Sequence, residues 1–239
     1  LGTWYHEGGM YKVVEAMVSL AESLGVEFEF GQPVSSIDVE NGIARGVRVN
    51  GHAYVADAVL GSADYNHIEQ NLLPEGYRTY SPDYWDKRTM SPSSLIFFLG
   101  IGKKIKNLKH HMLFFDEDFS KHAAEIYEDP KWPTKPSIYI SNTSQTDNSV
   151  APDGMENIMV LIPVAPGLED TQETREKYYD YILDKLEKFT GDSIRDAVVY
   201  KRSYAHRDFE ADYNAFKGNA YGLANTLMQT AFLKPKLQS

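Results

Sequence analysis

Apolar residues recur at intervals of three and four between residues 10 and 24. The residues that share this face are Val13, Val14, Met17, Val18, Ala21 and Leu24. This spacing predicts an amphipathic helix that ends at Gly25, because glycine commonly follows the last helical turn. In residues 26–30 (VEFEF) apolar and acidic side chains alternate. Alternation of this kind predicts a strand with its three apolar residues on one face.

Two Asn-Gly pairs separate runs of β-forming residues in the next part of the chain. The pairs are Asn41-Gly42 and Asn50-Gly51. This dipeptide favours the two-residue type I′ turn of a β-hairpin, so residues 34–59 are predicted to form a three-stranded meander. The pattern of residues 58–64 predicts a short buried strand that ends at Ala63-Asp64.

Residues 65–90 are polar and aromatic, and Pro74, Gly76 and Pro82 interrupt them. Proline and glycine break regular structure. We therefore expect this stretch to be a crossing between two domains more than a stable element, with a boundary near Tyr80.

The remainder of the chain alternates between strand and helix patterns. Strands are predicted at residues 93–101, 110–115, 136–141 and 156–165, with another after residue 194. Helices are predicted at residues 121–127 and 173–189, and in the second of these Tyr178, Ile182, Leu186 and Phe189 share one face. A loop with two glycines and a short helix are predicted near the end. The patterns together indicate an α+β fold, with a mixed or antiparallel sheet, helices on one of its faces, and a separate helix and β-meander.

Composition narrows the classes of partner. The chain has 34 acidic and 24 basic residues, a formal charge of −10, which repels phosphate backbones, so we expect no nucleic acid partner. It contains no cysteine, which excludes disulfides and thiol nucleophiles. The longest apolar stretches, residues 95–102 and 158–165, are far shorter than the ~20 residues that span a bilayer.

Several familiar site motifs are missing from the sequence. Neither G-x-G-x-x-G nor the P-loop pattern occurs, so this chain lacks the usual cradle for a pyrophosphate. The nucleophile elbow G-x-S-x-G is also missing. His110 and His111 are adjacent, and neighbouring residues on a strand point to opposite faces. We therefore expect one buried, hydrogen-bonded imidazole and one exposed imidazole, and no metal site.

Six stretches, in order, resemble the FAD-dependent carotenoid desaturases of the bacterial phytoene and diapophytoene type. They are residues 2–37 (GTWYHEGGM…PVSSI), 55–64 (VADAVLGSAD), 88–101 (RTMSPSSLIFFLGI), 108–115 (LKHHMLFF), 146–164 (TDNSVAPDGMENIMVLIPV) and 208–235 (DFEADYNAFKGNAYG…FLKP). The sequence departs from the family pattern at His6, where the family has proline, and at Ser62, where it has asparagine.

The resemblance implies a division into three parts. Residues 1–80 would supply the glycine-pair helix and β-meander of an amine-oxidase-like FAD-binding fold, residues 81–215 the substrate domain, and residues 216–239 a segment returning toward the FAD domain. The family's amino-terminal Rossmann segment and closing glycine-rich segment have no counterpart here. We expect the chain to be the central section of a longer enzyme, inactive and without retained FAD when alone.

The resemblance also assigns residues to the flavin. Gly8 and Gly9 would approach the isoalloxazine closely, because a backbone without Cβ atoms permits this; the alternative is a simple helix-entry turn. The backbone of Val34 would pair with the adenine, or Val34 would only pack in the meander. Ala63 and Asp64 would lie near the flavin, or Asp64 would cap the next turn.

The implied reaction removes two hydrogens from a saturated C–C bond flanked by polyene, with hydride passing to FAD. The cofactor carries the difficult chemistry, and we assign no catalytic side chain. A C30 or C40 substrate needs a long apolar tunnel. Candidate wall residues are Leu95, Phe97, Leu99, Phe114, Tyr139, Met159, Leu161 and Tyr221, and the alternative for each is sheet core.

In residues 214–222 (NAFKGNAYG), four residues combine polar, aromatic and flexible character. They are Asn214, Gly218, Tyr221 and Gly222, and we expect them to line the reaction zone; the alternative is a glycine-punctuated turn with a buried tyrosine. Because such a substrate resides in a bilayer, we expect a cytoplasmic protein that binds a membrane peripherally. The candidate contact is the region from Tyr77 to Trp132, with Trp85 and Trp132 as anchors.

Two other functional readings stay open at this point. The first keeps the scaffold and changes the reaction, as in a retinol saturase, carotene isomerase or amine-oxidase-like relative, because a fold does not determine its chemistry. The second is a binding module for apolar ligands with no redox role.

Overall fold

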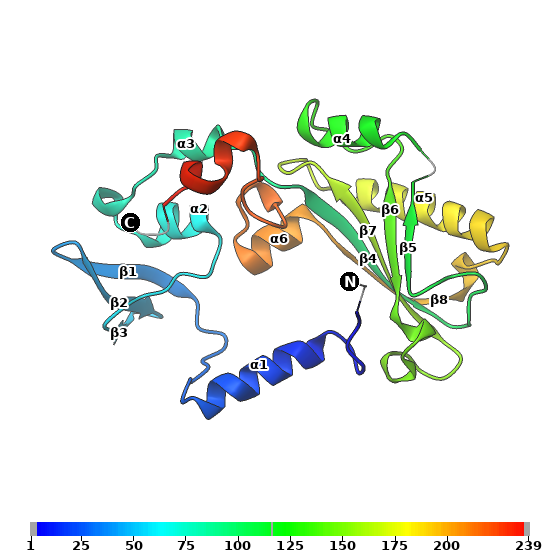
Figure 1. Ribbon diagram of the computed structural model, residues 1–239, viewed down its shortest axis with the longest axis horizontal. Coiled ribbons are helices and arrows are strands. Elements are labelled where there is room, and N and C mark those ends of the chain that lie inside the picture. Colours follow the sequence, from blue (N-terminus) through cyan, green and yellow to red (C-terminus); the bar gives the residue numbers. More distant parts are fainter. Residues whose placement is uncertain (1–3, 116, 237–239) are drawn as a thin grey trace. The chain divides into compact units, whose positions relative to one another are not determined.

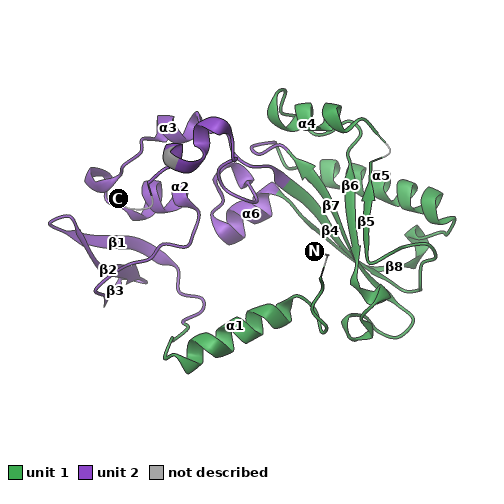
Figure 2. Ribbon diagram, in the orientation of Figure 1, with its two compact units in different colours: residues 1–28, 94–164, 169–205 green, residues 29–93, 165–168, 206–239 purple. Residues whose placement is uncertain are grey.

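The computed structural model (Figure 1) describes residues 4–115 and 117–236. The chain divides into two compact units, each built from separate stretches of sequence (Figure 2). The first unit comprises Leu1–Phe28, Ser94–Val164 and Glu169–Ala205, and the second comprises Glu29–Ser93, Ala165–Leu168 and His206–Ser239. Residues 1–3 and 237–239, at the two ends of the predicted three-part division, lie outside the described residues.

A five-stranded sheet forms the centre of the first unit, with the order β5-β6-β7-β4-β8. Its strands are β4 (Ser93–Ile101), β5 (His111–Phe114), β6 (Ile138–Asn142), β7 (Glu156–Val164) and β8 (Val198–Tyr204). The pairs β4–β8, β5–β6 and β6–β7 are antiparallel. The five strands predicted for this part of the chain are thus confirmed.

Helix α5 (Gln172–Thr190) lies along one face of this sheet (Figure 1). Its side chains Tyr178, Ile182 and Leu186 belong to the same buried cluster as Leu95, Phe97 and Leu99 of β4. The Thr171 side chain accepts a hydrogen bond from the N–H of Thr174 and caps the helix. The helix ends at Gly191. The predicted apolar face is confirmed for these three residues, whereas Phe189 is exposed.

Side chains on the other face of the sheet are less covered. Because successive strand residues alternate between faces, the residues between the core positions point away from α5. Half-buried or exposed members of this set are Ile96, Phe98, Tyr139, Ser141, Asn157, Met159 and Leu161. We call this second surface the open face of the sheet.

Two further helices belong to the first unit. Helix α1 (Tyr11–Ser23) confirms the predicted amphipathic helix, and none of its residues is buried. Helix α4 (Phe119–Tyr127) confirms the helix predicted at 121–127, and Asp118 caps it by accepting from the N–H of Ser120.

The second unit contains a three-stranded antiparallel sheet in the order β1-β2-β3. Its strands are β1 (Val34–Glu40), β2 (Ile43–Val49) and β3 (His52–Val55). Both Asn-Gly turns have positive φ at their two central residues, as a type I′ turn requires. The predicted meander is therefore confirmed.

Two of the predicted strands are wrong. Residues 26–30 and 58–64 belong to neither sheet, and Phe30 and Leu60 are 83% and 95% exposed. A strand forms by pairing with a neighbouring strand, and the alternation of side chains along one segment does not specify that pairing.

Short helices make up most of the rest of the second unit: α2 (Tyr65–His67), α3 (Pro82–Asp86) and α6 (His206–Tyr213). Single turns of π- or 3₁₀-helix occur in the chain at Ile68–Leu72, Glu75–Tyr77, Thr143–Gln145, Asn148–Val150, Arg195–Ala197, Phe216–Gly218, Leu227–Gln229 and Ala231–Leu233. The last two replace the short helix predicted near the end. Helix α6 was not predicted.

The expectation that residues 65–90 lack a stable element is wrong. Glu69 is fully buried, and its carboxylate accepts hydrogen bonds from the N–H groups of Thr79 and Tyr80, both at 3.0 Å. The Trp85 ring lies 5.2 Å from that of Tyr65, centre to centre. Buried hydrogen bonds and aromatic packing thus give this proline-interrupted stretch a fixed structure.

Candidate functional site

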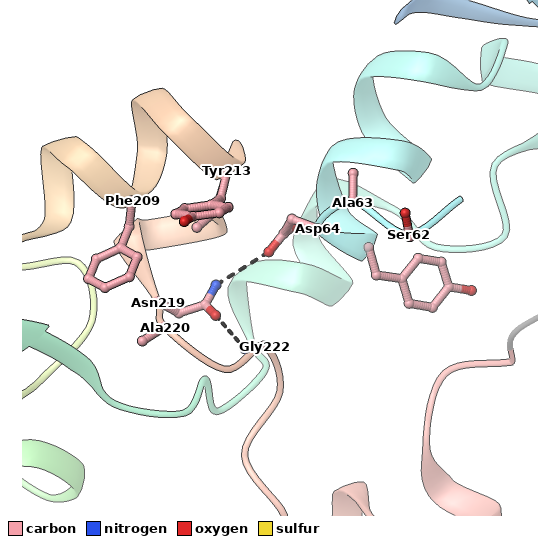
Figure 3. Close-up of a pocket in the computed structure, with 10 residues that line it drawn as sticks. Ser62, Ala63, Asp64, Phe209, Tyr213, Asn219, Ala220 and Gly222 are labelled. Atoms are coloured by element: carbon pink, nitrogen blue, oxygen red, sulfur yellow. Dashed lines mark hydrogen bonds between the residues drawn. The ribbon is translucent and has the colours of Figure 1, made fainter. Parts of the chain in front are cut away.

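One pocket in the second unit lies beside the start of α2 and the segment that follows α6 (Figure 3). Its volume is about 530 Å³, and we call it the Asp64 pocket. The lining residues are Ser62, Ala63, Asp64, Tyr65, Phe209, Tyr213, Ala215, Asn219, Ala220 and Gly222. Three residues predicted from the sequence, Ala63, Asp64 and Gly222, are therefore brought together here.

The carboxylate of Asp64 connects two distant stretches of the chain. It accepts a hydrogen bond from the N–H of His67 at 3.2 Å, which caps α2. It also accepts from the N–H of Phe216 at 3.3 Å and from the side-chain amide of Asn219 at 3.4 Å. The carbonyl of the Asn219 side chain accepts from the N–H of Gly222 (Figure 3). The alternative interpretation of Asp64 as a cap is thus confirmed.

The other residues predicted within 214–222 lie in different surroundings. Gly218 is buried with φ +60 against His206. Asn214 is exposed at the end of α6, where its N–H donates to the carbonyl of Glu210. Tyr221 is 72% exposed. The turn of the alternative interpretation is present at Phe216–Gly218, but its buried tyrosine is wrong.

Sequence reasoning did not single out Phe209, Tyr213 or Asn219 in this pocket. Phe209 and Tyr213 are four residues apart, and their ring centres lie 6.3 Å apart on one face of α6. That spacing is visible in the sequence, but it has meaning only once the helix is known. Asn219 lies within the glycine-containing motif, where its residue type alone does not distinguish it from Asn214.

A second pocket, of about 510 Å³, lies in the first unit on the open face of the sheet, and we call it the Gly9 pocket. The lining residues are Trp4, Tyr5, Gly9, Met10, Phe98, His111, Tyr139, Ser141, Thr143, Val150, Asn157 and Met159. Aromatic and apolar side chains dominate this set, as is usual for ligand pockets. It includes the predicted flavin residue Gly9 and the predicted wall residues Tyr139 and Met159.

Aromatic rings form a row beside this pocket. The ring centre of His110 lies 4.7 Å from that of Tyr5 and 4.3 Å from that of His111. A hydrogen bond of 2.6 Å joins His111 Nδ1 and the hydroxyl of Tyr139. The two imidazoles are therefore neighbours, and the expectation that they point to opposite faces is wrong, because His110 precedes β5.

Burial, together with the nearby His111, lowers the pKa of His110. Within residues 4–115 and 117–236 there is no cluster of three metal-ligating side chains.

The glycine pair forms a tight turn immediately before α1. Gly8 and Gly9 have φ +86 and +96, and the N–H of Gly9 donates to the carbonyl of His6 at 3.1 Å. A Cβ atom at Gly9 would lie 3.7 Å from Val150, inside the pocket lining. The helix-entry interpretation holds for this turn. Gly9 also lines the Gly9 pocket without a Cβ atom, which is the feature that close approach of a flavin ring would use.

Val34, Phe97 and Phe114 line neither pocket. Val34 begins β1, which is an edge strand of its sheet beside β2. Phe97 lies in the core with 1% exposure. Phe114 packs against this core and against Phe189, at 5.2 Å between ring centres. Both phenylalanines occupy the sheet-core position of the alternative interpretation.

The two tryptophans predicted as membrane anchors differ in exposure. Trp85 is 1% exposed, so its predicted anchor role is wrong. Trp132 is half-buried and packs on the core of the first unit, with its Nε1–H donating to the carbonyl of Glu169. Exposed apolar side chains in this region include Leu113, Phe115 and Phe119. In the part of the chain that the structure describes, no helix has the length and apolar character to span a bilayer.

Comparison with known proteins identifies related chains. A model of the family described as flavin containing amine oxidoreductase matches residues 1–239. The chain is 41% identical over 239 residues to the carotenoid 3,4-desaturase of Haloarcula japonica, an alignment that covers 100% of this chain and 48% of that protein. It is 33% identical over 245 residues to a 4,4'-diapophytoene desaturase (4,4'-diaponeurosporene-forming) of Staphylococcus haemolyticus, covering 98% and 49%. The chain thus spans about half the length of these curated relatives.

Solved structures with a similar fold include an oxidoreductase from Methanosarcina mazei, with a TM-score of 0.55, 17% identity and coverage of 83% of this chain and 43% of that one. Reduced UDP-galactopyranose mutase gives a TM-score of 0.57 and 17% identity, covering 83% and 39%. The likeness of these structures concerns the fold alone. Together with the sequence matches it confirms the predicted resemblance and the predicted α+β class.

Proposed function

The chain belongs to the flavin containing amine oxidoreductase family, and from this premise we propose that it serves an FAD-dependent enzyme that removes two hydrogens from a C30 or C40 polyene. One observation carries the proposal. The Gly9 pocket places a bare glycine backbone beside an aromatic and apolar surface on the open face of the sheet. A flavin ring needs a backbone that it can approach closely, and a hydrocarbon chain needs an apolar surface. The relatives named above as carotenoid desaturases support this reading over the other reactions of the scaffold.

Bound FAD would supply the hydride-accepting chemistry. In the first unit the proposed flavin residues are Gly8 and Gly9 at the turn before α1. In the second unit they are Val34 at the start of β1 and Ala63 with Asp64, which line the Asp64 pocket. Each offers backbone, or a side chain already fixed by hydrogen bonds, so its position does not depend on the ligand. Fixed geometry is what a hydride transfer requires of the protein, since the rate depends on distance and orientation.

The polyene itself would lie on the open face of the sheet. Phe98, Met159 and the ring of Tyr139 offer a surface of low polarity, and burying apolar area contributes about 25 cal/mol per Å². The hydroxyl of Tyr139 is engaged by His111, so the ring can contact hydrocarbon without leaving its polar atom unpaired. These side chains would also exclude water from the reacting bond.

Gly222, Gly218, Asn214 and Tyr221 of the second unit remain proposed substrate residues, and their surroundings differ. Gly222 lines the Asp64 pocket. Gly218 fixes the turn against His206, while Asn214 and Tyr221 are available at the surface. In this proposal Phe97 and Phe114 act from the core, by supporting the strands that carry the open face.

A matched pair of glycine variants tests the proposal. Gly9→Ala and Gly154→Ala both place a methyl group on a left-handed backbone, with φ +96 and +75, but only the first adds it beside Val150 in the Gly9 pocket. In the full-length gene product we expect Gly9→Ala to lower flavin content or polyene turnover by about tenfold or more, while Gly154→Ala stays near wild type. Equal effects of the two variants would contradict the proposal. A wild-type protein that binds polyene and holds no flavin would favour the binding-module reading.

Access to a polyene dissolved in a bilayer requires peripheral contact with the membrane. We propose that Leu113, Phe115 and Phe119 make this contact, because they are exposed and because Phe115 and Phe119 form an edge-to-face pair. A chain of net charge −10 should prefer neutral lipid. Binding to phosphatidylcholine vesicles should be lost in the Phe115→Ser, Phe119→Ser double variant and kept in a Tyr221→Ser control. Retained binding in the double variant would contradict the assignment.

A further inference from the structure

Asp147 is a charged residue in an unusually enclosed position. It lies in the loop between β6 and β7, before the 3₁₀ turn Asn148–Val150, and is only 6% exposed. A buried carboxylate is costly unless donors surround it. The donors that surround Asp147 come from two stretches of the chain that are far apart in sequence.

Two of these donors come from the same loop. Oδ1 of Asp147 accepts from the N–H of Ser149 at 2.9 Å and from its hydroxyl at 2.6 Å. These bonds cap the 3₁₀ turn, which carries Val150 at its end. Asp147 therefore fixes the position of Val150, which lines the Gly9 pocket.

The other donors come from the segment before α1. Oδ2 of Asp147 accepts from the N–H of Gly8 at 2.7 Å, across a separation of 139 residues. The Tyr5 hydroxyl also interacts with this carboxylate. One side chain thus holds the glycine turn and the Val150 turn together, and the Cβ direction of Gly9 points to Val150 at 3.7 Å.

We propose that Asp147 is a positioning residue that holds Gly9 and Val150 in place as one wall of the Gly9 pocket. The importance of this wall for polyene binding rests on the proposed function. The hydrogen bonds by which Asp147 joins the glycine turn to the Val150 turn, which we call the tie, do not depend on it. Hydrogen bonds from the Ser149 hydroxyl and N–H and from the N–H of Gly8 lower the pKa of Asp147. The carboxylate is therefore ionised at neutral pH, and its hydrogen bonds are charge-assisted.

Asp147→Asn tests the tie with little change in shape. The Asn amide nitrogen must replace one oxygen and would then face a donor, either the N–H of Gly8 or the N–H of Ser149. Asp153→Asn is the matched control, since it makes the same change at an exposed position six residues further along. Ser149→Ala keeps the charge and removes one donor, so it provides a second, milder variant if Asp147→Asn does not fold.

The first readout is hydrogen exchange at the amides of Gly8 and Gly9 in the full-length gene product. We expect Asp147→Asn to accelerate exchange about tenfold or more, the size expected for losing a charge-assisted hydrogen bond. Ser149→Ala should give a smaller increase and Asp153→Asn none. Unchanged exchange in Asp147→Asn, or in Ser149→Ala if the first variant does not fold, would overturn the proposal.

The second readout separates positioning from general stability. With polyene substrate, at a temperature at which circular dichroism shows the variant folded, we expect Asp147→Asn to raise KM about fivefold or more and to weaken flavin retention, because the glycine turn proposed to contact both ligands is no longer held. Faster exchange with an unchanged KM would overturn the role of Asp147 in the wall. If the wild-type protein does not turn over polyene, the proposed function fails, and the exchange experiment still decides whether Asp147 ties the two turns.

Discussion

Gly218 and His206 pack so closely that a Cβ atom built on Gly218 would lie 2.7 Å from the Cβ of His206. This contact fixes the turn after α6 against the first residue of that helix. His206 is itself held, because its Nε2 is hydrogen-bonded to the carbonyl of Ala165 at 2.7 Å. Neither partner of the contact is therefore free to move aside.

Gly218→Ala should destabilise the protein by about 2–4 kcal/mol, because overpacking adds to the strain of an alanine with positive φ. Gly222→Ala is the control, since Gly222 has φ +77 and open space at its Cβ, and it should cost only about 1 kcal/mol. Urea denaturation monitored by circular dichroism measures both. A similar decrease in the free energy of unfolding for the two variants would mean that the close contact with His206 does not add to the cost of Gly218→Ala.

Asp170→Ala should be among the most damaging changes of a charged residue in the first unit. The Asp170 carboxylate pairs with both Nε and Nη2 of Arg175, and the two side chains are 1% and 7% exposed. Removing one partner leaves a buried charge, and the expected cost is about 3–5 kcal/mol. Asp184→Ala removes an exposed partner of Arg195 and should cost less than about 1 kcal/mol. Thermal denaturation compares the two variants. An equal decrease in melting temperature would contradict the conclusion that the buried pair contributes more to stability than the exposed one.

Asp64→Ala should lower stability by about 1 kcal/mol, the usual effect of losing a helix cap. Asp64→Asn should recover most of this loss, since asparagine caps helices nearly as well as aspartate. Chemical denaturation of the two variants provides the comparison. An equal loss in both would show that the charge of Asp64, and not its capping bond to His67, is what stabilises this pocket.

Acid should release the segment before α1 in two stages. Burial and His111 hold the pKa of His110 below its ordinary value, so the stability it contributes is present above about pH 6.5 and is lost as the pH falls toward the lower folded pKa. Hydrogen bonds from Ser149 and Gly8 likewise lower the pKa of Asp147, so its contribution is present above about pH 4 and is lost below that. Tyr5, which also faces Asp147, has a raised pKa through burial and stays neutral throughout.

Hydrogen exchange at Gly8, corrected for its intrinsic pH dependence, measures this release. Protection should decrease first below about pH 6.5 and again below about pH 4. A His110→Gln variant should lack the first step, and Asp147→Asn should lack the second. Protection that stays constant down to acid pH would contradict both assignments.

Local chemistry made part of this fold predictable. The two Asn-Gly turns specify the meander, because only residues that tolerate positive φ form type I′ turns. Thr171, the apolar face and Gly191 likewise mark the start, the buried side and the end of α5. Each of these signals lies within a few residues of the element that it determines.

Features that depend on distant partners were not predictable in this way. Residues 26–30 alternate as a strand does but belong to neither sheet. The Asp64 pocket combines residues 62–65 with residues 209–222, and the tie between Gly8 and Asp147 spans 139 residues. Periodicity in one sequence carries no information on which segments meet. The glycine pair and Asp147 both lie in stretches that resemble the family, but the hydrogen bond between Gly8 and Asp147 is visible only in the structure.

The central claim is that this chain serves flavin-dependent desaturation of a polyene. Its most direct test is to mix the full-length gene product, under anaerobic conditions, with a C30 or C40 polyene that retains saturated bonds next to its conjugated section. We predict that the visible absorbance of bound flavin is bleached while the polyene gains one conjugated double bond per flavin reduced. A protein that copurifies with flavin and binds the polyene, but leaves both spectra unchanged, would contradict the account.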